Sequence, residues 1–237
     1  MTPRLPGAPQ PPTATLHAHI PAPGFADPVH DAQRTFRALL AALARPTTAV
    51  PLPVEVPAPG ALTGGAAALL LTVADESTPL WLDPTLAGDH DLTEWIAFHT
   101  GARTVDDRAL AAFAVVATPS ALPPLDSFAP GSDEAPHTST TVVIATEHPG
   151  TDALLDVDAT SGMDTPGSAG YGAGPAFTAY GPGFPEPTPW RAPDLPADFP
   201  VQWAANGAAF PRGVDLVFAA DDTLVGLPRT TRLTEVD

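Results

Sequence analysis

The chain of 237 residues contains no cysteine, so no disulfide can cross-link it and no thiolate can serve as a nucleophile or hold an iron–sulfur cluster. A chain of this length can bury roughly 70–75% of the surface that its unfolded form exposes. An apolar core can therefore stabilise the fold without disulfide cross-links. A hydrophobic fraction of 44% and a charged fraction of 16% are typical of such a globular protein.

Lysine is absent as well, and this limits the chemistry. All ten basic residues are arginines, set against 27 Asp and Glu. A Schiff base with pyridoxal phosphate needs a lysine amine, and a P-loop needs a lysine on the terminal phosphates. We therefore expect any bound anion to be held by arginine, by backbone N–H groups or by hydroxyls.

The net charge of −17 argues against nucleic acid or an anionic membrane as a partner. Residues 1–24 lack the cationic segment and apolar core of a signal peptide. No apolar run approaches the 18 residues of a membrane span. These features favour a soluble, cytoplasmic protein.

Two segments differ in amino-acid composition from the rest of the chain. Residues 1–24 form a proline-rich tail that we expect to be extended, with a short strand at 15–20. Residues 150–175 are rich in Gly, Ser and Asp and predict a long surface loop. The remainder, residues 25–237, is predicted to be one domain.

Residues 31–45 predict the first helix, which Pro46 ends. Its apolar side chains recur at helical spacing and predict one buried stripe made of Phe36, Leu39, Leu40 and Leu43. The opposite face carries Arg34, Arg37 and Arg45. That face is either solvated or ligand-binding.

Two further helices are predicted. The helix at 91–100 would begin with Asp91 as its cap and Glu94 in capping-box position, and Gly101 would end it. The helix at 198–206 would be capped by Asp198 and carry Phe199 and Trp203 on one side.

Short apolar runs predict strands at residues 66–73, 80–82, 111–117, 140–145 and 176–180, and a hairpin of 214–219 with 223–227. Because strands and helices alternate, we predict a three-layer α/β domain in which helices cover both faces of a mixed sheet.

Most catalytic motifs are missing. His17 and His19 form a pair in the tail, but the other histidines are scattered and predict no metal site. His99 is interpreted as a packed or capping residue. There is no GxSxG motif, and the glycines at 60–65 and 170–174 do not follow a strand–GxGxxG–helix order.

Arginines remain as candidate anion ligands. The candidates are Arg34 and Arg37 in the first helix, and Arg212, Arg229, Thr230 and Thr231 near the C-terminus. An arginine followed by two hydroxyls could form a small anion cradle. Alternatively, Arg229 pairs with Asp215, a polar residue that interrupts an apolar strand, and ties the C-terminus down.

Five blocks together resemble the H subunit family of the bacterial carbon–phosphorus lyase complex. They are residues 24–46 (GFADPVHDAQRTFRALLAALARP), 69–82 (LLLTVADESTPLWL), 98–114 (FHTGARTVDDRALAAFA), 179–184 (AYGPGF) and 210–233 (FPRGVDLVFAADDTLVGLPRTTRL). The resemblance implies a fold similar to the large domain of pyridoxal-phosphate-dependent transferases, without the cofactor.

The resemblance also implies partners and a process. The H subunit works with the G, I and J subunits in a core assembly, in which a phosphonate displaces adenine from ATP to give a ribose phosphonate triphosphate. Radical cleavage of the C–P bond belongs to the J subunit. A homodimer is implied for the isolated chain.

Three hypotheses follow for the function. The first is an accessory subunit with no catalytic residues, metal or cofactor of its own. The second is an arginine-lined site for a phosphonate or nucleotide phosphate, completed by a partner. The third, a stand-alone transferase using pyridoxal phosphate, is opposed by the lack of lysine.

Overall fold

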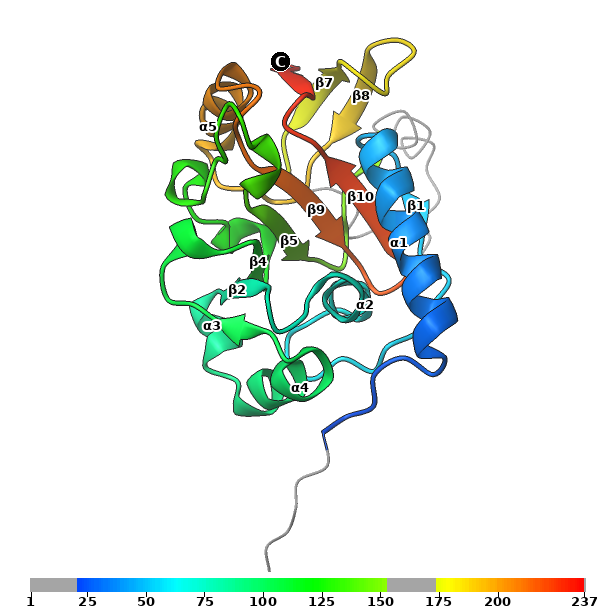
Figure 1. Ribbon diagram of the computed structural model, residues 1–237. Coiled ribbons are helices and arrows are strands. Elements are labelled where there is room, and N and C mark those ends of the chain that lie inside the picture. Colours follow the sequence, from blue (N-terminus) through cyan, green and yellow to red (C-terminus); the bar gives the residue numbers. More distant parts are fainter. Residues whose placement is uncertain (1–20, 153–173, 237) are drawn as a thin grey trace, which may run out of the picture.

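The computed structural model describes residues 21–152 and 174–236 (Figure 1). The strand predicted at 15–20, the pair His17 and His19, and most of the loop predicted at 150–175 lie outside these residues. Within the described part, a large mixed sheet separates two apolar cores. No described helix combines the length and the apolar character that crossing a bilayer requires.

The large sheet has seven strands in the order β1-β10-β9-β5-β4-β2-β3. Their bounds are β1 Val50–Pro51, β2 Pro79–Leu82, β3 Arg103–Thr104, β4 Phe113–Val116, β5 Thr141–Ala145, β9 Asp215–Ala219 and β10 Thr223–Leu227. Strands β3, β2, β4, β5 and β9 are parallel, whereas β10 and β1 are antiparallel to their neighbours. The predicted mixed sheet and the predicted hairpin are confirmed.

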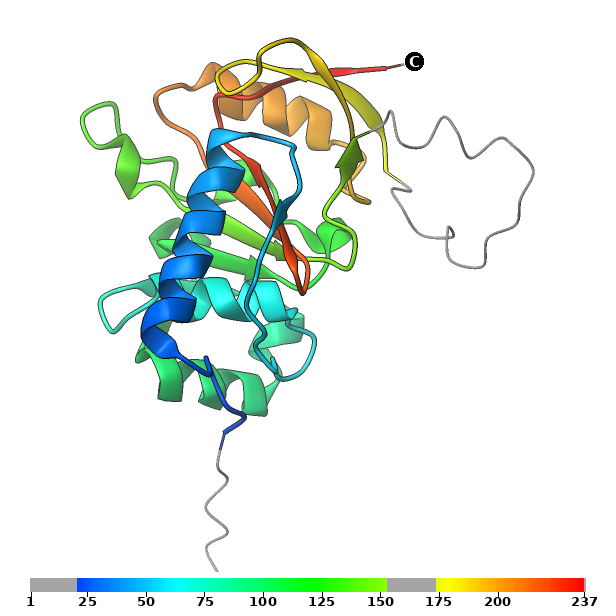
Figure 2. The ribbon, with the colours of Figure 1, turned by 90° about the vertical axis from the view of Figure 1, so that its right-hand side faces the viewer.

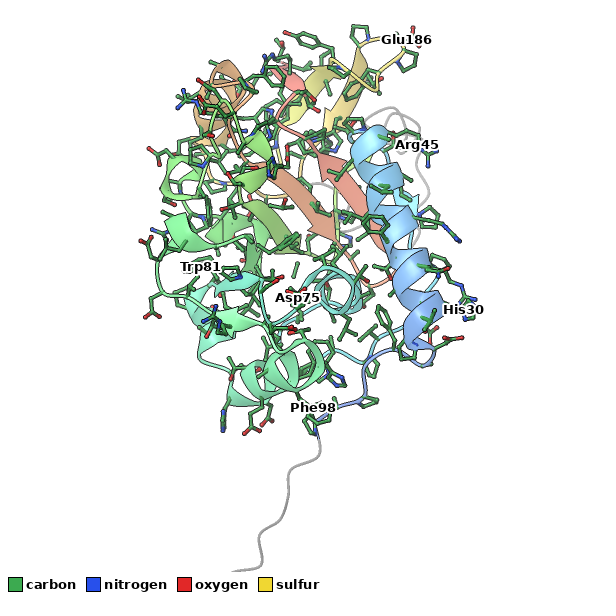
Figure 3. All side chains as sticks on the ribbon, viewed as in Figure 1. His30, Arg45, Asp75, Trp81, Phe98 and Glu186 are labelled. Atoms are coloured by element: carbon green, nitrogen blue, oxygen red, sulfur yellow. The ribbon has the colours of Figure 1, made fainter. Side chains whose placement is uncertain are left out.

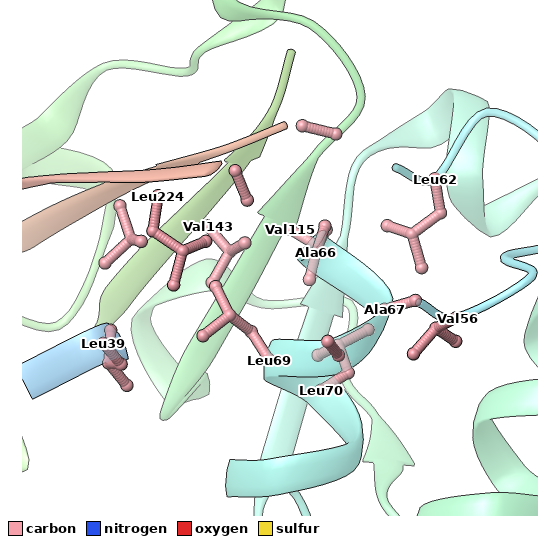
Figure 4. Packing of buried hydrophobic residues seen from close by; sticks show 14 of the residues in the cluster. Leu39, Val56, Leu62, Ala66, Ala67, Leu69, Leu70, Val115, Val143 and Leu224 are labelled. Carbon is pink, nitrogen blue, oxygen red and sulfur yellow. The ribbon is translucent and has the colours of Figure 1, made fainter. Parts of the chain in front are cut away.

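Helices cover one face of this sheet (Figures 1 and 2). They are α1 Pro28–Ala44, α2 Gly64–Val73, α3 Pro84–Ala87 and α4 His90–Thr100. In Figure 4, Ala66 of α2 lies beside Val115 of β4, and Leu69 of α2 lies near Val143 of β5. This first core is built mainly from aliphatic side chains, together with Trp95 of α4.

The segment 66–73, predicted to be a strand, is instead the body of helix α2. Its N-terminus is capped by Thr63, whose Oγ1 accepts from the backbone N–H of Ala66 at 3.3 Å. A helix that is buried all round shows no apolar periodicity, and a run rich in Ala and Leu favours a helix over a strand. Continuous burial was therefore the correct prediction, and the strand was wrong.

The other face of the large sheet is covered by α5, Phe199–Ala208, and by a second sheet. That sheet has the order β11-β7-β8-β6, with bounds β6 Thr151–Asp152, β7 Ala176–Tyr180, β8 Thr188–Arg191 and β11 Arg232–Glu235. Its Trp190 packs on Phe218 of β9 with ring centroids 6.0 Å apart. Short 3-10 turns at Arg108–Leu110, Pro119–Ala121, Leu125–Ser127 and Pro136–Thr138 complete the described chain.

The helix ends differ in part from prediction. Asp89, not Asp91, caps α4, because its Oδ1 accepts from the N–H of Leu92 at 3.1 Å. Gly101 ends that helix in the left-handed conformation, at φ 70°, as predicted. Asp198 stands at the N-cap of α5, but its side chain makes no capping hydrogen bond.

Helix α1 buries a different face from the predicted stripe. Of the four stripe residues only Leu39 is buried and Leu43 partly so, whereas Phe36 and Leu40 are exposed. The buried face consists of Asp31, Thr35, Ala38, Leu39 and Ala42. Small residues fit there because β10 comes very close: a Cβ added at Gly226 would lie 2.6 Å from the carbonyl oxygen of Ala42.

Candidate functional site

The carboxyl ends of the parallel strands are the usual ligand position in an open α/β sheet. Here the start of α2 packs against that edge. The hydroxyl of Thr63 donates to the carbonyl of Ala219 at 2.8 Å, and the N–H of Gly65 donates to the carbonyl of Ala220 at 3.0 Å. The N–H of Gly64 donates to Asp221 Oδ1 at 2.8 Å. The first N–H groups of α2 are therefore occupied by the protein itself.

Beside this edge lies a crevice of about 1090 Å³, formed where α1, the segment 52–58 and the turn after β9 meet. Its charged lining residues are Asp31, Glu55, Asp221 and Asp222, and its lining contains no arginine or histidine. Like charges repel, and the field inside a crevice is focused by its low-dielectric walls. The crevice therefore disfavours phosphonate and nucleotide phosphates.

Asp83, at the end of β2, is buried but has a structural role. Its Oδ1 accepts from the N–H groups of Thr85 and Leu86 at 2.8 and 3.0 Å. Its Oδ2 accepts from the N–H of Ala117 at 2.5 Å. The carboxylate thus caps α3 and fixes the end of β4, which accounts for its burial.

Arg229 lies near the opposite edge of the sheet, where β9 begins. Its Nε and Nη2 donate to the two carboxylate oxygens of Asp215 at 3.1 and 2.5 Å. Nη2 also contacts Ser139 Oγ, and Nη1 donates to the carbonyls of Pro136 and Pro211 at 3.2 and 3.3 Å. The guanidinium is directed at protein groups, as in the predicted alternative of a pair with Asp215.

The two threonines that follow Arg229 lead into β11. Thr231 is buried, and its Oγ1 has no hydrogen-bond partner among the described residues. Its carbonyl accepts from Trp203 Nε1 of α5 at 3.0 Å. Thr230 is half-buried and lines a hollow of about 350 Å³ together with Tyr180 and Arg232.

Arg232 is the arginine that sequence reasoning missed. It is exposed, pairs with Tyr180 across the β11–β7 ladder, and lines two adjoining hollows. Its guanidinium lies over Gly207 of α5, where an added Cβ would approach Nη1 closely. Within the described part of the chain it makes no ion pair. The sequence feature that could have pointed to Arg232 is the cluster of arginines and hydroxyls at residues 229–232.

The other candidate arginines lie elsewhere. Arg212 is near the start of β9, pairs with Asp133 at 3.2 Å and lines a separate pocket of about 510 Å³ beside α5. Arg34 pairs with Asp31 at 2.8 Å on α1, and Arg37 is exposed on the same helix. The structure therefore does not bring the arginines of α1 together with those near β9 in one cradle.

His99 is packed, as predicted. Its Nε2 lies 2.9 Å from the carbonyl oxygen of Ala22, and its ring contacts Trp95 and Phe98 at centroid distances of 5.0 Å. Among residues 21–152 and 174–236, no group of three or more potential ligands is placed to hold a metal ion.

Two exposed carboxylates have lowered pKa values. A hydrogen bond from the ring of His30, at 2.7 Å, is the main cause that lowers the pKa of Asp27, the cap of α1. The Ser77 hydroxyl, at 2.7 Å, is the main cause that lowers the pKa of Asp75, with Thr78 next. Figure 3 shows His30 and Asp75 at separate places on the molecule. Neither carboxylate lines a described pocket, so both are interpreted as local caps.

Comparisons with known proteins agree with the family resemblance of the five sequence blocks. A model of the family described as "Bacterial phosphonate metabolism protein (PhnH)" matches residues 23–234. The chain is also 36% identical, over 219 residues, to the alpha-D-ribose 1-methylphosphonate 5-triphosphate synthase subunit PhnH of Rhizobium meliloti (strain 1021). That alignment covers 92% of this chain and 98% of the relative. The chain therefore belongs to the PhnH family of bacterial phosphonate metabolism proteins.

Proposed function

We propose that this chain is an accessory subunit of the assembly in which a phosphonate displaces adenine from ATP, giving a ribose phosphonate triphosphate. The observation that carries the proposal is the carboxylate-lined crevice at the ligand-binding edge of the sheet. A chain that met these anions alone would present cations there. The name of the Rhizobium meliloti relative, a synthase subunit, supports the same process.

The proposed partners are the G, I and J subunits of the carbon–phosphorus lyase core complex. Co-expression of the four chains, with a tag on this one, tests the proposal. We expect the tagged chain to retain all three partners on purification and to elute with them at the size of one assembly. Elution of the tagged chain by itself, with the other three found in a separate fraction, would overturn it.

We also propose that the isolated chain is a cytoplasmic homodimer, and that its fold is the large domain of a pyridoxal-phosphate-dependent transferase that no longer holds its cofactor. Support comes from the mixed sheet with helices on one face and α5 on the other, and from the absence of lysine. Sedimentation of the purified chain measures its oligomeric state. Titration with pyridoxal phosphate should give no visible imine absorbance band.

The second candidate function is an anion site that a partner completes. Arg232 favours it, because this arginine is exposed, makes no described ion pair and lies beside Tyr180 and Thr230. A charge-assisted contact from arginine to phosphate is worth about 1.5–3 kcal/mol before desolvation. The −17 charge opposes anions at long range, so a neighbouring subunit would have to supply more cations.

Calorimetry with methylphosphonate and with ATP separates the two functions. We expect no heat of binding to the isolated chain and measurable binding to the assembled complex. The variant Arg232→Gln should then weaken binding by the complex, whereas Arg103→Gln, a change of another exposed arginine, should not. Equal binding by both variants would eliminate Arg232 as a ligand.

A further inference from the structure

Helix α1 exposes several of its larger apolar side chains, although Leu39 is buried. Ala38, Ala42 and Thr35 face the core, whereas Phe36 and Leu40 are 48% and 51% exposed. A surface helix normally directs its largest apolar residues toward the core. The close approach of β10 at Gly226 places Ala42 against the strand and leaves Phe36 and Leu40 on the outer side of α1.

The exposed residues form one line along the helix. Val29 is 64% exposed, and it precedes Phe36 by seven residues and Leu40 by eleven. At 3.6 residues per turn these three positions fall on the same side. We call Val29, Phe36 and Leu40 the outer ridge. In Figure 1 α1 is the outer wall of the described molecule, and in Figure 2 it faces the viewer along its whole length.

Positive charge lies next to the outer ridge. Arg37, which lies between Phe36 and Leu40 in the sequence, is exposed beside the ridge, whereas Arg34 and Arg45 lie toward the opposite side of the helix. Arg34 is paired with Asp31 from its own helix, whereas Arg37 and Arg45 make no ion pair with a described residue. Figure 3 shows Arg45 extending from the end of α1 opposite to His30. The cation of Arg37 beside the ridge contrasts with the net charge of −17 of the whole chain.

We propose that the outer ridge of α1 docks into an apolar groove, rimmed by carboxylates, on a sister subunit of the complex. Laying the apolar residues of a helix into a groove at i, i+7 and i+11 spacing is a common mode of recognition. Arg37 supplies charge complementarity to the rim, which sets orientation and speeds association. This inference rests on the proposed function and assigns a surface to it.

A second copy of the chain fits this surface less well. A symmetric contact through α1 would place the helix antiparallel to its own copy, since a two-fold axis repeats the same patch on both sides. Arg37, near the middle of the ridge, would then face its own copy, and like charges at short range oppose the contact. An acid-rimmed groove on a different subunit removes this repulsion.

The test uses the full chain co-expressed with the G, I and J subunits. The double variant Phe36→Glu, Leu40→Glu should weaken capture of the partners by about tenfold or more, as loss of central apolar anchors does. Its far-UV circular dichroism and thermal midpoint should match the wild type, because both positions are exposed. Matched controls are Phe98→Glu on α4 and Val201→Glu on α5, which also replace exposed apolar residues and should capture normally.

The single variant Arg37→Glu reports on the rim without removing an apolar anchor. It should slow association and reduce the dependence of the rate on salt. It also keeps the inference testable if the double variant does not fold.

The outcomes separate the two proposals. If the wild type captures the partners and the double variant captures them equally well, the docking inference is wrong and the proposed function stands. If the wild type captures none of them, both are wrong. If the wild-type chain is a dimer that the double variant converts to a monomer, the ridge binds a second copy and the inference is overturned.

Discussion

Asp215 and Arg229 join four separate parts of the chain at the start of β9. The guanidinium contacts the carboxylate, the Ser139 hydroxyl and the carbonyls of Pro136 and Pro211. The arginine and aspartate side chains are only 12% and 22% exposed. A pair that is largely withdrawn from water depends on all of its hydrogen bonds, because each remaining charge must be solvated by the protein.

Replacing Arg229 with methionine should therefore be costly. We expect the free energy of unfolding, measured by urea denaturation at neutral pH, to fall by about 2–3 kcal/mol, since the Asp215 carboxylate is left without its partner. Arg212→Met is the control. Arg212 makes a solvent-exposed pair with Asp133, so its loss should change stability by less than about 0.5 kcal/mol. Equal losses in the two variants would contradict the structural role of Arg229.

The carboxyl group of Asp75 should report its local hydrogen bonds through its titration. The Ser77 and Thr78 hydroxyls and the Ser77 N–H donate to the ionised form, which lowers its pKa from the ordinary value of 3.8. A lowered native pKa means that this stabilisation is fully present above the unfolded pKa. It is lost as the pH falls through the native pKa.

NMR titration of the Asp75 side-chain carbonyl measures this directly. The double variant Ser77→Ala, Thr78→Val should raise the pKa toward the ordinary value, because two donors are removed. Asp27, whose pKa is lowered mainly by the hydrogen bond from His30, serves as the internal reference carboxyl, and its titration should not move between the two proteins. An unchanged Asp75 midpoint in the variant would show that these hydroxyls do not favour the ionised form.

At the scale of elements, the contact between α1 and β10 decides which face of the helix is buried. Gly226 lets the strand approach the helix backbone, and Ala42 is fully buried at the contact. Ala44, two residues later, is exposed. The helix therefore offers two alanines of the same chemistry in opposite environments.

Enlarging each alanine separates packing from helix propensity. Ala42→Leu should lower the free energy of unfolding by about 1–3 kcal/mol, because three extra carbon atoms must displace β10 or the helix. Ala44→Leu should change it by less than about 0.5 kcal/mol, since leucine is nearly as good a helix former as alanine. Thermal or urea unfolding of both variants is the measurement. A tolerated leucine at position 42 would mean that the two elements can separate easily.

The existence of most elements could be predicted from local pattern. The strands with Leu80, Val115 and Val143 at their centres are short β-rich runs between turn residues, and α4 and α5 carry caps or terminators at the expected ends. The identity of α2 could not be predicted from periodicity, because a segment buried on all sides has none that distinguishes helix from strand, and its Ala- and Leu-rich composition was the remaining signal for a helix. Length alone favoured neither.

The buried face of α1 could not be predicted from local sequence pattern, for a different reason. Phe36, Leu39, Leu40 and Leu43 are the strongest apolar set on the helix, and a helix considered alone would bury them. The actual face depends on Gly226, which lies far away in the sequence and provides a close contact for small residues.

For the arginine candidates as well, the sequence predicted the location of the cluster but not the contacts of its members. The sequence pointed to the 229–232 cluster, and the pairing of Arg229 with Asp215 was a stated alternative. What the sequence could not reveal is that Ser139 and two carbonyls take up the remaining donors of Arg229, since these partners come from distant loops. For the same reason it gave no basis for separating Arg232, which is exposed and makes no described ion pair, from its neighbour.

At the scale of the whole molecule, negative charge is distributed unevenly. The net charge is −17, and the crevice lined by Asp31, Glu55, Asp221 and Asp222 concentrates part of it, whereas the outer side of α1 carries the cation of Arg37. Self-repulsion of this kind weakens the compact state. It should weaken the isolated chain most where carboxylates face one another without cations.

Salt should therefore act in opposite directions on the chain and on its assembly. Raising NaCl from about 0.01 M to about 0.1 M shortens the screening length from about 30 Å to about 10 Å. The free energy of unfolding of the isolated chain should rise by on the order of 1 kcal/mol, because repulsion among carboxylates is screened. Association with the partner subunits should slow over the same range, because the attraction between Arg37 and a carboxylate rim is screened as well.

Two measurements on the same preparations check this prediction: thermal unfolding of the isolated chain and the rate of partner association, each as a function of salt. The variant Glu55→Gln, Asp222→Asn provides the control, since it removes two crevice carboxylates and leaves α1 unchanged. It should raise stability at low salt and flatten the salt dependence of unfolding, while the salt dependence of association stays as in the wild type. A stability that falls with salt would mean that attractive pairs outweigh repulsion, and that the −17 charge is balanced locally in a way the crevice does not suggest.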